Sequence, residues 1–87
     1  MKKKLLKIAK FFSQSADSRY DILAEGYGFD LQHYGLTAKA ITINTVETAN
    51  DEFIPMNKLT NTDLDYVLDV LNNIQLSEEK MMERARG

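Results

Sequence analysis

The sequence predicts an α+β fold: an N-terminal amphipathic helix, a four-stranded antiparallel meander and a C-terminal helix form one domain, with both helices packed on one face of the sheet. Two observations support this prediction. Apolar residues recur with the 3.6-residue period of a helix over residues 1–15 and 60–76. Between them, over residues 18–57, apolar and polar residues largely alternate, as in strands with one buried face. Every turn that can be placed there is short, which favours consecutive hairpins.

The first predicted helix, residues 1–15, is basic and amphipathic. Its apolar face carries Leu5, Ile8, Ala9 and Phe12, and its opposite face carries Lys3, Lys7, Lys10 and Gln14. Phe11 flanks the lysine side, so we expect it to stay partly exposed. Lys7 and Lys10 interrupt the apolar run, which leaves segments too short for a secretory signal or a membrane span. Two interpretations remain open: a helix that packs on the core, or one that docks on a membrane surface or a partner.

Two strands with a hairpin between them are predicted next, over residues 19–24 and 29–34. In the first strand Tyr20, Ile22 and Ala24 alternate with Arg19, Asp21 and Leu23. In the second, Phe29, Leu31 and His33 alternate with Asp30, Gln32 and Tyr34. Gly26 and Gly28 favour a tight turn between the strands because glycine adopts positive φ at low cost.

The third and fourth predicted strands cover residues 37–46 and 52–56. The third is rich in β-branched residues on both faces, which indicates a central strand. Residues 48–51 are predicted to form a turn. Pro55 predicts that the fourth strand lies at an edge or ends early, because proline has no N–H for the ladder. The solvent face of this sheet is predicted to carry Arg19, Asp21, Asp30, Gln32, Tyr34, Thr42 and Asn44.

The helix over residues 60–76 supplies most of the predicted core. Its stripe consists of Leu64, Val67, Leu68, Leu71 and Ile74, and burying five such side chains contributes roughly 8 to 15 kcal/mol before entropy is subtracted. Thr60 and Asp63 have the spacing of a capping box at its start. Asp65 and Asp69 repel each other at i, i+4 unless solvent or a lysine of the first helix compensates them.

Residues 77–87 are predicted to be helical or a frayed tail. Met82 and Ala85 keep the phase of the preceding stripe, which favours a helix that continues past Leu76. Glu78 falls within that stripe and favours a break or a new cap at Ser77.

Length and composition indicate one small domain. In 87 residues, 44% hydrophobic and 28% charged, the stability margin is thin, and a homodimer is one expected arrangement. The chain has no cysteine, which fits a cytoplasmic protein without disulfides. Its net charge of -2 hides five lysines in residues 1–12 and thirteen acidic residues in the remainder.

Catalytic and metal-binding patterns are sparse. His33 is the only histidine, and on a strand its spacing from Asp30 places the two side chains on opposite faces. Residues 50–52 are adjacent acids and amides without the alternating spacing of a calcium loop. Gly26 and Gly28 lack the third glycine and the following helix of a phosphate-binding loop. We therefore expect a non-enzymatic protein with no metal and no cofactor.

The leading functional expectation is a small protein–protein interaction module that uses an exposed sheet edge and the aromatic residues Tyr27, Phe29 and Tyr34. The alternative is a peripheral protein that binds nucleic acid or anionic membranes through Lys3, Lys7 and Lys10.

Overall fold

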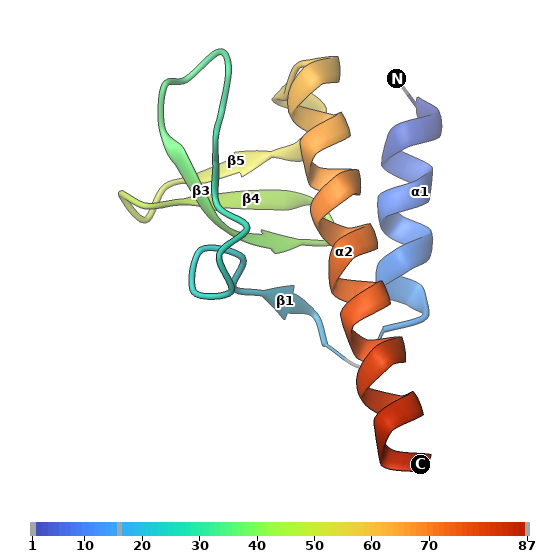
Figure 1. Cartoon of the computed structure of the whole chain (residues 1–87). Helices are drawn as coiled ribbons and strands as arrows, with labels where there is room; N and C mark the ends of the chain where they lie inside the picture. The colour runs from blue at the N-terminus through green and yellow to red at the C-terminus, as the bar shows by residue number, and fades with distance from the viewer. Residues whose placement is uncertain (1, 16, 87) are drawn as a thin grey trace.

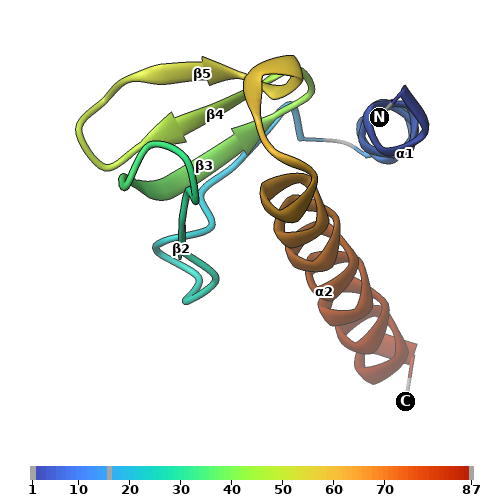
Figure 2. The ribbon, with the colours of Figure 1, turned by 90° about the horizontal axis from the view of Figure 1, so that it is seen from above.

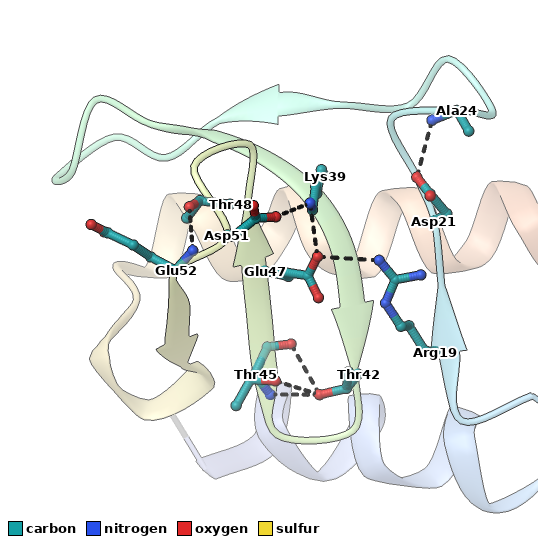
Figure 3. A network of polar contacts seen from close by, with 10 residues as sticks. All are labelled: Arg19, Asp21, Ala24, Lys39, Thr42, Thr45, Glu47, Thr48, Asp51 and Glu52. Carbon is teal, nitrogen blue, oxygen red and sulfur yellow. Dashed lines mark hydrogen bonds and ion pairs between the residues drawn. The ribbon is translucent and has the colours of Figure 1, made fainter.

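The computed structural model describes the backbone of residues 2–15 and 17–86 and the side chains of residues 3–15 and 17–76. Helices α1 and α2 lie side by side and pack with one antiparallel sheet (Figure 1). Viewed from the outer face of the sheet, both helices lie behind it (Figure 3). The α+β prediction is therefore confirmed. In chain order the elements are α1 (Lys2–Ser13), β1 (Arg19–Tyr20), β2 (Phe29–Asp30), β3 (Thr37–Thr42), β4 (Thr45–Thr48), β5 (Phe53–Pro55), the 3-10 helix η1 (Met56–Lys58) and α2 (Asn61–Arg86).

The predicted hairpin between residues 19–24 and 29–34 is wrong. The sheet order is β1-β3-β4-β5, and β2 also pairs with β3. Tyr20 of β1 lies opposite Ile41, and Phe29 of β2 lies opposite Ala38, so both short strands occupy the same edge of β3. Figure 2 shows this edge opposite the edge formed by β5.

Local turns explain why the two predicted strands are so short. The Asp21 carboxylate accepts a hydrogen bond from the Ala24 N–H at 3.2 Å, which is the turn chemistry that Asp favours. Gly26 has a φ of 86°, a conformation that glycine adopts without a Cβ penalty. The chain therefore leaves the ladder after Tyr20 and returns at Phe29.

The prediction of one strand over residues 37–46 is wrong, because this stretch contains a hairpin. Its central position in the sheet is confirmed, since β3 and β4 each have neighbouring strands on both sides. Thr42 and Thr45 flank the connection between β3 and β4. The Thr42 Oγ1 accepts the Thr45 N–H at 3.1 Å and contacts the Thr45 hydroxyl at 2.6 Å, as Figure 3 shows. This side-chain bonding fixes a turn where β-branched residues alone favour continued extension.

The edge position predicted for the strand containing Pro55 is confirmed. Among the residues that the structure describes, β5 pairs with β4 alone, and Ile54 lies opposite Val46. The predicted turn over residues 48–51 is confirmed as well, with the Asp51 N–H bonded to the Thr48 carbonyl at 2.9 Å.

Helix α2 buries the predicted stripe. Leu64, Val67, Leu71 and Ile74 are buried, and Leu68 packs against the core while partly exposed. Strand residues such as Ile41 and the α1 residues Ile8 and Phe12 belong to the same core, so the first helix does pack on the domain. The α2 backbone continues without a break from Asn61 to Arg86, which resolves the question left open at Ser77.

At the start of α2, one of the two hydrogen bonds of the predicted capping box is present. The Thr60 hydroxyl accepts the Asp63 N–H at 3.2 Å, as predicted. The Asp63 carboxylate does not return to the Thr60 backbone; it accepts the Gln32 N–H instead. Asp63 is fully buried, because it connects α2 to the loop after β2.

Candidate interaction surface between the two helices

Helices α1 and α2 run in the same direction (Figure 1), and an ion pair joins their N-terminal halves. The Lys4 ammonium lies 2.7 Å from Asp65 Oδ1 and donates to the Asn61 carbonyl at 3.4 Å. A lysine of the first helix therefore relieves the repulsion predicted between Asp65 and Asp69.

A half-open cleft of about 470 Å³ lies between the two helices farther toward the C-terminal end of α1. Its apolar lining comes from Phe11 of α1, Tyr20 of β1, and Leu68 and Leu71 of α2. Residues near the N-terminus, from α1 and β1, and residues of the distant helix α2 thus form one surface, which we call the helix cleft.

The rings of Phe11 and Tyr20 in this lining pack against each other and against Phe12. The Phe11 ring centroid lies 5.5 Å from that of Phe12 and 5.6 Å from that of Tyr20. Phe12 and Tyr20 are 5.7 Å apart. These distances fall in the favourable range for edge-on aromatic packing. The Tyr20 hydroxyl is hydrogen-bonded to the Ser15 hydroxyl, so its polar end has a partner at the end of α1.

The two sides of the helix cleft differ in charge. Lys7 and Lys10 line the α1 side, while Asn72 and Gln75 line the α2 side. Neither lysine makes an ion pair with any side chain that the structure describes. The cleft therefore combines an apolar floor, one cationic rim and one neutral rim, with Gln14 and Ser15 also among its lining residues.

The third predicted basic residue, Lys3, is exposed on α1 and does not line the helix cleft. Leu6 lies between Lys3 and Lys10 on the same side of the helix, at spacings of three and four residues, and is 67% exposed. The helical period places Leu6 off the apolar face formed by Leu5, Ile8, Ala9 and Phe12, which agrees with its exposure.

The predicted aromatic surface is not a continuous exposed patch. Tyr27 and Phe29 are partly buried and pack against the core, and the Phe29 ring stacks on Tyr66 of α2 at 5.3 Å. Tyr34 is 38% exposed, and its hydroxyl lies 3.5 Å from the Lys58 carbonyl oxygen. Tyr34 is therefore the one exposed member of the predicted set.

The open edge of β5 offers few hydrogen-bond donors. The Met56 N–H bonds to the Asn44 carbonyl, and the Thr48 N–H bonds to the Glu52 carbonyl. In an antiparallel ladder this register turns residues 53 and 55 toward the open edge. Residue 55 is proline, so Phe53 provides the outward N–H of this strand. Strand addition at this edge is therefore disfavoured.

The outer face of the sheet carries an ionic network. Glu47 Oε2 lies 3.2 Å from the Arg19 guanidinium and 3.1 Å from the Lys39 ammonium, which also contacts Asp51, as Figure 3 shows. Hydrogen bonds from Lys39, and then from Arg19, hold the pKa of Glu47 below its usual value. The Lys39 contact also lowers the pKa of Asp51, and the carboxylates of Asp51 and Glu47 raise the pKa of Lys39.

His33 and the acids of residues 50–52 do not form a reactive cluster. The His33 ring is exposed and packs edge-on against Tyr34 at 5.3 Å. Asp51 is paired with Lys39. Among the described side chains, no group of three or more histidine, aspartate or glutamate residues is arranged to hold a metal ion.

Neither described helix contains a stretch that is long and apolar enough to cross a bilayer. Comparison with models of protein families, with curated proteins and with solved structures found no match. The chain is thus a small two-layer α+β protein with a cleft between its two helices.

Proposed function

We propose that this protein is a non-enzymatic interaction module that binds a segment of another protein in the helix cleft. One observation supports this most strongly: Phe11, Leu68 and Leu71 form an apolar floor beside two lysines without an acidic partner among the described side chains. Protein ligands are recognised by this combination of buried apolar contact and a few placed charges. Its volume of about 470 Å³ is within the range of ligand-binding clefts.

The helix cleft is a better candidate than the aromatic surface expected from the sequence. Tyr27 and Phe29 are already committed to packing within the domain, so they offer little area to a partner. Tyr34 remains available as a peripheral contact. The β5 edge is also a poor docking site because Pro55 removes a main-chain donor.

Differential affinity capture tests this proposal. The full-length chain and three variants are immobilised, and proteins retained from a native lysate are identified by mass spectrometry. A cleft ligand is retained by the wild type and by Lys3→Glu, and is lost with Lys7→Glu/Lys10→Glu and with Leu68→Ala. Lys3→Glu is the matched control because it reverses one exposed lysine of α1 outside the cleft. Retention that is equal across all four proteins contradicts the proposal.

The second candidate function is binding to an anionic surface, either a membrane or a nucleic acid, through the exposed side of α1. The observation that favours it is Leu6, which is 67% exposed between Lys3 and Lys10, as on helices that lie at a membrane surface. Under this function, Lys3→Glu weakens binding as much as Lys7→Glu does. Co-sedimentation with anionic vesicles, and a duplex DNA shift assay over about 0.05 to 0.5 M salt, measure this.

A second copy of this chain is one partner that the leading proposal covers, because a domain this small gains stability from a partner subunit. We also propose that the protein acts in the cytoplasm. Light scattering on the purified chain tests self-association. A mass that doubles with concentration for the wild type, and not for Lys7→Glu/Lys10→Glu, assigns the cleft to a homodimer.

A further inference from the structure

We infer, building on the proposed function, that the helix cleft holds a short amphipathic helix with carboxylates along the flank that faces α1. Three features of the cleft support this occupant: the spacing of its two walls, the hydrogen bonding of their backbones and the placement of the lysines.

The walls of the cleft have the spacing of helix surfaces. On α1, Lys7, Phe11 and Gln14 follow one another at i, i+4 and i+7. On α2, Leu68, Leu71 and Gln75 follow at i, i+3 and i+7. Each row covers two helical turns, about 10 Å at a rise of 1.5 Å per residue. Two such neighbouring rows form a groove that accepts the side-chain ridge of a third helix.

The hydrogen-bonding state of the walls disfavours an extended peptide. Most of the lining residues belong to α1 and α2, where interior backbone groups bond within the helix. Tyr20 is paired with Ile41 in the sheet. An extended segment needs main-chain partners from its receptor, and these walls supply few. A helical ligand satisfies its own backbone and brings only side chains to the cleft.

The positions of the lysines determine which flank of the bound helix faces α1. Lys7 and Lys10 stand one turn apart on the α1 side, while the α2 side presents the amides of Asn72 and Gln75. Glutamates at i and i+3 or i+4 on the α1-facing flank of the ligand match both lysines. The flank that faces α2 needs polar, uncharged residues. This asymmetry separates the proposed ligand from a generally acidic helix.

A designed probe peptide tests this inference on the full-length chain. The acidic probe has about 14 residues, long enough for three helical turns, with a leucine stripe, glutamates on one flank and glutamines on the other. A basic probe replaces every glutamate with lysine, and a scrambled probe breaks the leucine stripe. Binding is followed by amide shifts of the isotope-labelled protein, so the site and the affinity are measured together.

The expected result is a charge-dependent preference at the cleft. The acidic probe shifts the amides of Leu68, Leu71 and Gln75 and binds the wild type at least roughly tenfold more tightly than the basic probe, a difference of about 1.4 kcal/mol. In Lys7→Glu/Lys10→Glu the preference reverses. In Lys3→Glu it is unchanged. Both variants alter exposed side chains, and their amide spectra without probe report whether the fold is retained.

Other outcomes overturn the inference and separate it from the proposed function. Equal binding of the acidic and scrambled probes, or no binding of either, excludes an acidic helix as the occupant. Laurate serves as a parallel probe with one carboxylate and an acyl chain. If laurate alone shifts the cleft amides, the occupant is a small amphiphile, while loss of a captured protein in the cleft variants still supports the interaction module. If no probe shifts these amides and capture is unaffected by the variants, both proposals fail.

Discussion

The Gln32 N–H donates to both carboxylate oxygens of Asp63, at 2.9 and 3.1 Å, across 31 residues of sequence. Asp63 lies in the first turn of α2 and is fully buried. Its charge is placed where the helix dipole favours an anion. The contact thus ties the start of the longest helix to the loop that follows β2.

The first prediction concerns this contact. Asp63→Ala removes the acceptor of the Gln32 N–H, and we expect the free energy of unfolding to fall by about 1 to 3 kcal/mol. Asp63→Asn keeps one oxygen and should lose less. Urea denaturation followed by circular dichroism measures both. Asp69→Ala is the control, because Asp69 is an exposed acid on the same helix. An Asp63→Ala loss no larger than the Asp69→Ala loss would show that the contact is not stabilising.

The Asp63 contact illustrates the difference between local features, which the sequence predicts, and long-range contacts, which it does not. The stripe from Leu64 to Ile74 and the Thr60 cap depend on residues within a few positions of each other, and both were predicted. The partner of Asp63 is 31 residues away, and nothing local indicates it. A capping box was the natural expectation, because the same carboxylate at that spacing satisfies a local N–H in many helices.

The strand errors have a similar origin. Alternation identified the sheet, the Thr, Asn and Asp residues of 48–51 identified the turn, and the missing N–H of Pro55 identified the edge position. It could not show that Thr42 and Thr45 use their hydroxyls to close a turn, since β-branched residues also favour extension. The periodicity of the sequence did not predict the helix cleft. Phe11 was expected to be partly exposed, but its proximity to Leu68 depends on how α1 packs against α2, a helix that is distant in sequence.

The second prediction compares what attaches α1 to α2. The Lys4 side chain is 30% exposed and the Asp65 side chain 64%, so their coupling in a double-mutant cycle should stay below about 1 kcal/mol and weaken with salt. Ile8 is fully buried, and Ile8→Ala should cost about 2 to 5 kcal/mol. Leu6→Ala is the exposed control, expected within about 0.5 kcal/mol of the wild type. A Lys4–Asp65 coupling larger than the Ile8→Ala loss would reverse this ranking.

The third prediction is a pH dependence of the outer-face network. The pKa values of Glu47 and Asp51 are lowered from 4.5 and 3.8. Their contribution to stability is therefore present above those values and is lost as the pH falls through the lower pKa values of the folded state. The pKa of Lys39 is raised from 10.5, so its contribution is present below that value and is lost as the pH rises through the folded pKa.

Thermal unfolding of Lys39→Met against the wild type measures this network. We expect the difference in melting temperature to be largest between about pH 5 and 9 and to shrink toward both extremes. Lys58→Met is the matched control, since Lys58 is exposed and makes no ion pair with the side chains described. Its effect should not vary with pH in this way. A Lys39→Met difference that is constant from acid to alkaline pH would exclude the network as the cause.

The fourth prediction concerns the open edge of β5. Residues 53 and 55 face this edge, and Pro55 removes one of its two donors. Pro55 has a φ of -60° and a ψ of 140°, which valine also adopts without strain. Pro55→Val therefore adds an outward N–H to an edge that already exposes Phe53 at 63%. Strand edges with unpaired N–H groups and exposed apolar side chains tend to pair with strands of other chains.

We expect Pro55→Val to self-associate through the β5 edge at concentrations at which the wild type does not. The free energy of unfolding of the monomer should change little. Light scattering over a concentration series measures the association. Phe53→Lys placed in the same variant should reverse it, because a lysine on an edge strand opposes pairing by charge repulsion. Association that persists in the double variant would mean that the new contact does not use this edge, and the protective role assigned to Pro55 would then be wrong.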